Sequence, residues 1–157
     1  MNTLTGYIGT YASPESLGIY RFTMDLDNGN LSKPELYYGA LDCKYLSLHG
    51  TLLAAPRKRD GQAGICLLDT AGGGASLAGE AFYETAPACY VTQDDACIYT
   101  ANYHEGCILV YRKSPDSLTL AKRIDIAPKA GCHQILFHNH YMLVPCLLLD
   151  TVKIYDC

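Results

Sequence analysis

The sequence predicts an all-β fold built from a repeated unit of four short strands. Short runs rich in β-branched and aromatic residues alternate with clusters of turn residues. Similar runs also recur at a nearly constant distance, because Tyr45, Tyr90 and Gln134 occupy equivalent positions 45 and 44 residues apart. A period of this length that holds several strands is typical of a β-propeller blade.

The clearest period predicts an antiparallel meander of four strands. The strands are expected at 90–93, 97–101, 107–112 and 120–126, with turns at 94–95 and 114–117 and a loop at 102–106. Successive strands of a meander reverse direction, so the loop between the second and third strands emerges on the same face as the connection to the next blade. A site shared by several blades is expected on that face.

Taken in order, the chain predicts one partial propeller domain of about three and a half blades. Residues 6–11 resemble a second strand, so the first blade begins without its innermost strand. We expect the N-terminal part of a longer propeller, whose open blade edges need further C-terminal blades or another chain. The predicted blades are 5–40, 44–84, 89–126 and an incomplete 132–157.

Composition narrows the classes of partner. The chain has 157 residues, a net charge of −4, 49% hydrophobic and 18% charged residues, and a pI of about 5.6. These values indicate a globular protein and argue against nucleic acid or a membrane surface as partners. The longest apolar run, 142–149, is too short for a membrane span, and the N-terminus has no signal-peptide pattern. We therefore expect a cytoplasmic protein.

Metal, redox and phosphate-loop motifs are not indicated. The eight cysteines show no C-x-x-C spacing and mostly lie in strand-like runs, so reduced thiols are expected. His138 and His140 form an H-x-H turn with no nearby carboxylate or cysteine to complete a metal site. The Gly72–Gly74 triplet precedes no helical pattern, which favours a flexible turn. We expect no cofactor and no bound metal.

Several segments together resemble the lactonase propeller family, which includes the cycloisomerase-type 6-phosphogluconolactonases and is related to carboxy-muconate lactonising enzymes. The resemblance implies a seven-bladed propeller that acts on a lactone at one mouth of its central channel. It covers essentially the whole chain, in the right order and spacing. The matching segments are 7–11 with 18–20, 99–103 with 106–111, and 131–133 with 143–145 and 152–155.

The resemblance implies one catalytic residue at a matching position, His133. His133 is expected at the start of an innermost strand, where its side chain can face the channel. An imidazole can accept a proton near neutral pH, so His133 is expected to act as a general base or to hydrogen-bond the substrate. The alternative is a histidine that satisfies backbone groups between blades. Some members of the family carry a second histidine, where this chain has Gly131. The arginine and glutamate motifs of the family's later blades have no match within residues 1–157.

Two pairs of residues are predicted to bind the substrate. Arg57 and Arg59 are expected on a loop of the second blade, on the same face as His133, where an arginine fork could hold a phosphate. A solvated basic loop is the alternative. Asn102 and Tyr103, on the equivalent loop of the third blade, could touch a polyol, although a turn-forming asparagine beside a packing tyrosine explains them as well.

The neighbouring His104 and Glu105 could supply an acid/base pair, but adjacent loop residues need not converge. The resulting hypothesis is hydrolysis of an anionic sugar lactone, a step of carbohydrate metabolism in the pentose phosphate pathway, as the resemblance implies. One alternative is a non-catalytic propeller that serves as a binding or scaffold module. The other is a muconate-type lactonising cycloisomerase.

Overall fold

The structure is a computed structural model that describes residues 2–115 and 117–157. The described residues form fourteen strands in four antiparallel sheets of three, four, four and three strands, and none of their segments is a helix that could span a membrane. Within each sheet the strands pair in chain order, as in a meander. The predicted all-β fold is confirmed, while Asp116 of one predicted turn lies outside the described residues.

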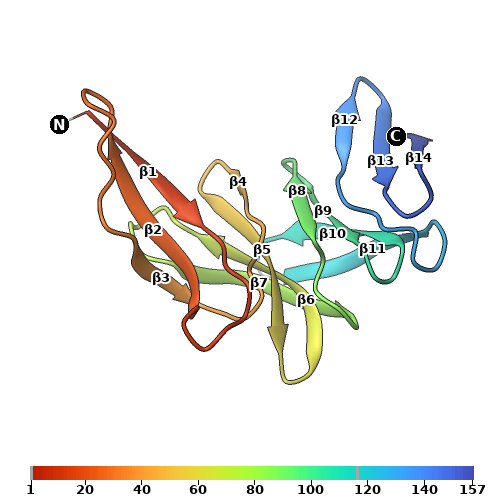
Figure 1. Ribbon diagram of the computed structural model, residues 1–157, viewed down its shortest axis with the longest axis horizontal. Helices are drawn as coiled ribbons and strands as arrows, with labels where there is room; N and C mark the ends of the chain where they lie inside the picture. Colours follow the sequence, from red (N-terminus) through yellow and green to blue (C-terminus); the bar gives the residue numbers. More distant parts are fainter. Residues whose placement is uncertain (1, 116) are drawn as a thin grey trace.

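The four sheets lie side by side in chain order (Figure 1). The first sheet contains β1 (Thr3–Ile8), β2 (Gly18–Asp25) and β3 (Glu35–Gly39). The second contains β4 (Ser47–His49), β5 (Leu52–Arg59), β6 (Gln62–Asp69) and β7 (Ser76–Glu84). The third contains β8 (Tyr90–Gln93), β9 (Cys97–Asn102), β10 (Cys107–Ser114) and β11 (Ser117–Asp125). The fourth contains β12 (Leu136–His138), β13 (Tyr141–Cys146) and β14 (Thr151–Asp156).

Two of the strand boundaries that differ from those predicted affect the candidate site residues. The β5–β6 hairpin continues to the pair Arg59–Gln62, because Asp60 and Gly61 have positive φ and form a tight two-residue turn. Arg57 and Arg59 therefore lie in a strand, and the prediction that they lie on a loop is wrong. In the fourth sheet β12 begins at Leu136, so His133 lies in the connection that precedes the strand.

Three hydrophobic cores fill the spaces between adjacent sheets. Ile19, Leu53 and Leu68 belong to the core between the first and second sheets, and Ile65 and Leu109 to the next. The third core, between the third and fourth sheets, includes Ala101, Ile108, Ile135, Met142 and Val144. Each sheet is thus stabilised by covering the apolar face of its neighbour.

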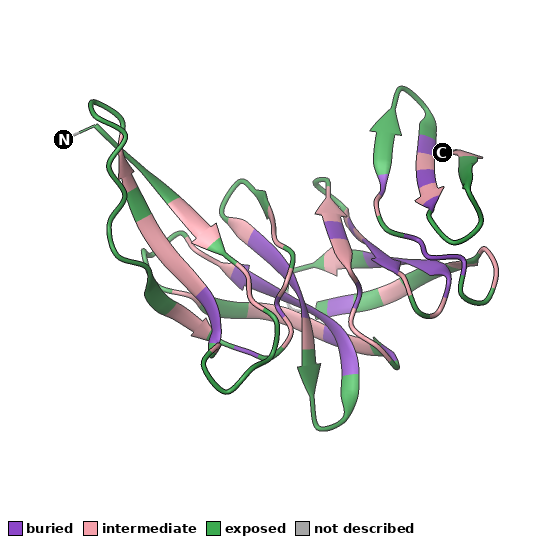
Figure 2. Cartoon of the chain, in the orientation of Figure 1, coloured by how far each residue is buried: buried purple, intermediate pink, exposed green. Residues whose placement is uncertain are grey.

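The two end sheets have one uncovered face each. In the fourth sheet Leu136, Leu143 and Ile154 are cross-strand neighbours, and the side chains of Leu136 and Ile154 are 47% and 63% exposed. In the first sheet Leu4 and Ile8 on β1 are also exposed. Figure 2 shows the contrast between these strands and the buried segments of the second and third sheets.

One polar network is buried between the second and third sheets. The Glu84 carboxylate, at the end of β7, is 5% exposed and accepts hydrogen bonds from Thr100 Oγ1 (3.3 Å), Asn102 Nδ2 (2.7 Å) and the Tyr111 hydroxyl (2.8 Å). Burial raises the pKa of Glu84, and the three donors oppose that shift. This carboxylate joins one strand of the second sheet to two strands of the third.

Replacing Glu84 by alanine is expected to lower the free energy of unfolding by about 3–5 kcal/mol, because three buried donors lose their acceptor and a cavity remains. Urea denaturation at pH 7 measures the loss. Glu84→Gln is the matched control and is expected to lose less than half as much, since its amide keeps an acceptor in place. Equal losses for both variants would contradict this role of the network.

Candidate functional site

His133 lies on a segment whose backbone is fixed and whose side chain is exposed. Its N–H donates a hydrogen bond to the Pro145 carbonyl (3.2 Å), and the preceding residue, Cys132, is buried and forms a β-bridge with Cys146. The imidazole is therefore accessible to a small molecule while its Cα position is held. Such accessibility is one requirement for a general base or a substrate-binding group.

Two glycines allow the chain to reach this position. Gly106, in the β9–β10 turn, has a φ of 67°, and its carbonyl accepts hydrogen bonds from the N–H groups of Ile126 (3.0 Å) and Ala127 (3.3 Å). A Cβ at Gly106 would lie 1.7 Å from the Ala127 oxygen. The turn therefore holds the start of the connection that leads to His133.

Gly131, two residues before His133, also has a positive φ, of 70°. A Cβ there would lie 2.9 Å from Leu148 Cγ and 3.2 Å from Tyr103 Cε2. A histidine at this position would be strained, which gives a physical reason for the glycine in this chain. The same distances show that Tyr103 lies against the His133 segment.

The structure therefore brings together Tyr103 and the His133 segment. The Tyr103 ring also makes an edge contact with the His104 ring, at 5.6 Å between centroids. Tyr103 is partly exposed, so it packs against the connection and still has surface available. Substrate contact by Tyr103 stays a prediction.

Cys89, beside His133, and Lys44, whose charge acts on Cys89, were not predicted as site residues from the sequence. The Cys89 thiol donates to the Ala101 and Cys132 carbonyls (3.3 and 3.2 Å) and lies 3.7 Å from the His133 oxygen. Burial raises the pKa of Cys89, while the positive charge of Lys44 acts to lower it. Lys44 and Cys89 occupy the repeat position of His133, one residue before Tyr45 and Tyr90. The repeat alignment therefore already contained the signal that could have found them.

Both arginines predicted to bind an anion are engaged by one carboxylate. Arg57 Nη1 lies 2.8 Å from Glu80 Oε2, and Arg59 binds the other oxygen of Glu80. The Arg57 side chain is only 11% exposed, and its guanidinium lies over the Tyr38 ring at 5.9 Å. Anion binding by either arginine stays a prediction, and it would compete with Glu80.

Asn102 is fully buried and holds the β9–β10 turn. Its Nδ2 donates to Glu84 and to the Ala86 carbonyl (both 2.7 Å), and its Oδ1 accepts from the Glu105 N–H (3.0 Å). These bonds use the side chain within the protein. Contact between Asn102 and a polyol stays a prediction.

Glu105 is also bound within the protein. Its carboxylate accepts from Thr85 N (2.7 Å) and Thr85 Oγ1 (2.9 Å) and forms an ion pair with Arg123 (2.9 Å). Although burial acts to raise the pKa of Glu105, these hydrogen bonds and the ion pair lower it below its usual value. Glu105 contacts Thr85 and Arg123, while His104 packs on Tyr103.

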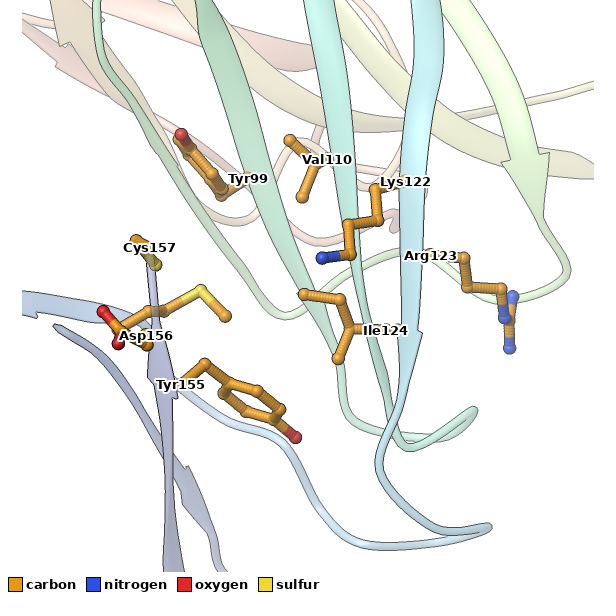
Figure 3. A pocket seen from close by; sticks show the side chains of 9 residues that line it. Tyr99, Val110, Lys122, Arg123, Ile124, Tyr155, Asp156 and Cys157 are labelled. Atoms are coloured by element: carbon orange, nitrogen blue, oxygen red, sulfur yellow. The ribbon is translucent and has the colours of Figure 1, made fainter. Parts of the chain in front are cut away.

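The described residues contain no cluster of side chains that could hold a metal ion, and all eight cysteines are free thiols. A cavity of about 450 Å³ lies between the third and fourth sheets, away from His133. Figure 3 shows Tyr155 and Ile124 facing each other across it. The cavity is mainly apolar and belongs to the packing between these sheets.

Substituting Gly106 by alanine is expected to destabilise the protein by at least 1–2 kcal/mol, because a side chain there needs a left-handed backbone and meets the Ala127 oxygen. Thermal unfolding measures the loss. Gly72→Ala is the matched control, since it lies in open space with no positive φ. A Gly106→Ala protein as stable as the control would contradict the close approach.

Glu105→Gln is expected to cost about 1–3 kcal/mol at pH 7, because it removes a charged acceptor with several donors. The folded state lowers the pKa of Glu105, so its contribution is complete above the ordinary glutamate pKa of 4.5 and is lost as the pH falls through the lower folded value. Urea titrations from pH 7 to pH 3 are expected to show the difference from wild type shrinking. Glu15→Gln, at an exposed loop position, is the control. A loss that does not change with pH would contradict the ionised carboxylate.

The chain is similar to known proteins in sequence and in fold. The chain is 31% identical over 151 residues to the 6-phosphogluconolactonase of Bacillus subtilis, covering 90% of this chain and 43% of that relative. A solved protein from Lactobacillus plantarum superposes with a TM-score of 0.87 at 24% identity, covering 99% of this chain and 49% of that one. The periplasmic gluconolactonase PpgL of Pseudomonas aeruginosa superposes at 0.84 and 18% identity, covering 99% of this chain and 50% of that one.

The solved structures share the fold, and the predicted partial propeller is confirmed. The chain spans about half the length of these relatives. The model of the family described as lactonase, 7-bladed beta-propeller, matches residues 5–157. The chain therefore belongs to the seven-bladed lactonase propeller family.

Proposed function

We propose that this protein hydrolyses a sugar lactone at the mouth of the propeller, with His133 as the assisting base. The observation that carries the proposal is the position of His133, an exposed imidazole on a fixed segment within a lactonase-family chain. The chain spans only part of its relatives, so its 157 residues need not supply every group of the site. The proposed blades remain 5–40, 44–84, 89–126 and 132–157.

The reaction requires water to add to the lactone carbonyl and the ring C–O bond to break. His133 would accept a proton from the attacking water and return it to the departing alkoxide oxygen, so that a hydroxy acid leaves. A donor to the oxyanion is needed as well. Tyr103 lies beside the His133 segment and is the nearest predicted substrate contact.

The finer proposal is an anionic substrate, a phosphorylated gluconolactone of the pentose phosphate pathway, handled in the cytoplasm. The name of the Bacillus subtilis relative supports it. The open edges of the first and fourth sheets would then be covered by further blades or by another chain. No nucleic acid, membrane or cofactor is part of the proposal.

The test is lactone hydrolysis by the purified encoded polypeptide, followed by pH-stat titration. His133→Ala is expected to lower the rate by about 100-fold to 10,000-fold with the fold intact, because a positioned base typically contributes that much. His140→Ala, which alters an exposed turn histidine, is the matched control.

Unchanged hydrolysis in His133→Ala would contradict the assigned base. A wild-type protein that binds sugar lactones but never opens them would support the scaffold alternative instead. Lactone formation from a muconate, identified by product analysis, would support the cycloisomerase.

A further inference from the structure

A phosphorylated substrate needs a cation near His133, and the predicted arginines are already bound. Arg57 and Arg59 share the Glu80 carboxylate, and Arg123 is paired with Glu105 and Asp125. A guanidinium held by a carboxylate is a poor phosphate site, because the two anions compete for the same donors. Another cation on the His133 side of the sheets would serve better.

The repeat places Lys44 on that side. Lys44, Cys89 and His133 occupy equivalent positions of the sequence repeat, in the connections that lead into β4, β8 and β12 of successive sheets (Figure 1). Adjacent copies of the repeat are in contact here, because the rings of Tyr45 and Tyr90, the residues after Lys44 and Cys89, lie 4.6 Å apart.

Direct contacts link Cys89 to the segment that carries His133. The Cys89 thiol hydrogen-bonds the Cys132 carbonyl at 3.2 Å and lies 3.7 Å from the carbonyl oxygen of His133. On its other side, the contact between the Tyr45 and Tyr90 rings holds the Lys44 connection against that of Cys89, and the lysine charge acts to lower the thiol pKa. Lys44 and His133 therefore flank one cysteine.

The Lys44 ammonium is in an environment suited to an anion. It lies 5.4 Å from the centre of the Tyr11 ring, and none of the described carboxylates forms an ion pair with it. Lys44 is half-buried, while Tyr11 beside it is 70% exposed, so a solute can approach. A partly desolvated ammonium without a carboxylate partner attracts anions.

We propose that Lys44 binds the phosphate of the substrate across Cys89 from His133. The inference rests on the proposed function for the identity of the substrate, and it makes Lys44 the residue that favours phosphorylated over unphosphorylated lactones. Tyr11 would hold the lysine side chain in place through the cation–π contact. His133 would act at the carbonyl end of the same molecule.

The experiment measures binding of 6-phosphogluconate, gluconate and inorganic phosphate to the encoded polypeptide by calorimetry. Lys44→Gln is expected to weaken 6-phosphogluconate and phosphate binding by roughly tenfold or more, because a charge-assisted contact is lost, and to leave gluconate binding unchanged. Lys44→Arg is expected to retain most of the affinity. Lys129→Gln is the matched control, an exposed lysine in the same connection as His133.

Unaltered phosphate affinity in Lys44→Gln, equal losses in Lys129→Gln, or no phosphate binding by the wild type would overturn the proposal. Circular dichroism of each variant shows that the fold is retained. Binding and hydrolysis separate the two proposals. Phosphate binding that depends on Lys44, without lactone hydrolysis, would contradict only the proposed function. Lactone hydrolysis with an unchanged KM in Lys44→Gln would contradict only the role of Lys44.

Discussion

Each sheet of this protein depends on the next sheet to cover one of its apolar faces. Three cores fill the three spaces between four sheets, and the end sheets expose Leu4 and Ile8 at one end and Leu136 and Ile154 at the other. Apolar packing alone is non-directional. The buried Glu84 carboxylate adds direction, because its hydrogen bonds with Thr100, Asn102 and Tyr111 fix the second sheet against the third.

The candidate site residues come from several sheets, and the packing of adjacent sheets determines their relative positions. Gly106 brings the β9–β10 turn onto the connection that follows β11, and the connection then presents His133. Asn102 reaches Glu84 from that turn, so the packing between sheets and the candidate site share a hydrogen-bond network. The proposed lactone hydrolysis and the proposed role of Lys44 both depend on the equivalent positions of the connections that lead into β4, β8 and β12.

The sequence repeat was enough to predict the strands and their meander order, but it placed His133 at the start of a strand and not in the connection that precedes β12. It could not predict that Arg57 and Arg59 meet Glu80, because that pairing joins β5 to β7 and depends on side-chain positions across a sheet. The burial of Asn102 likewise depends on Glu84 in another sheet. Lys44 was visible at the repeat position of His133, but its lack of a carboxylate partner among the described residues required the structure.

The coupling energy between Glu84 and Tyr111 tests most directly whether the buried hydrogen bonds of Glu84 fix the second sheet against the third. A double-mutant cycle with Glu84→Ala and Tyr111→Phe, each of which removes the shared hydrogen bond, measures it from free energies of unfolding in urea. The account predicts a coupling of about 1 kcal/mol or more, because the two side chains share a buried hydrogen bond across the sheets. Effects that add within about 0.3 kcal/mol would contradict it.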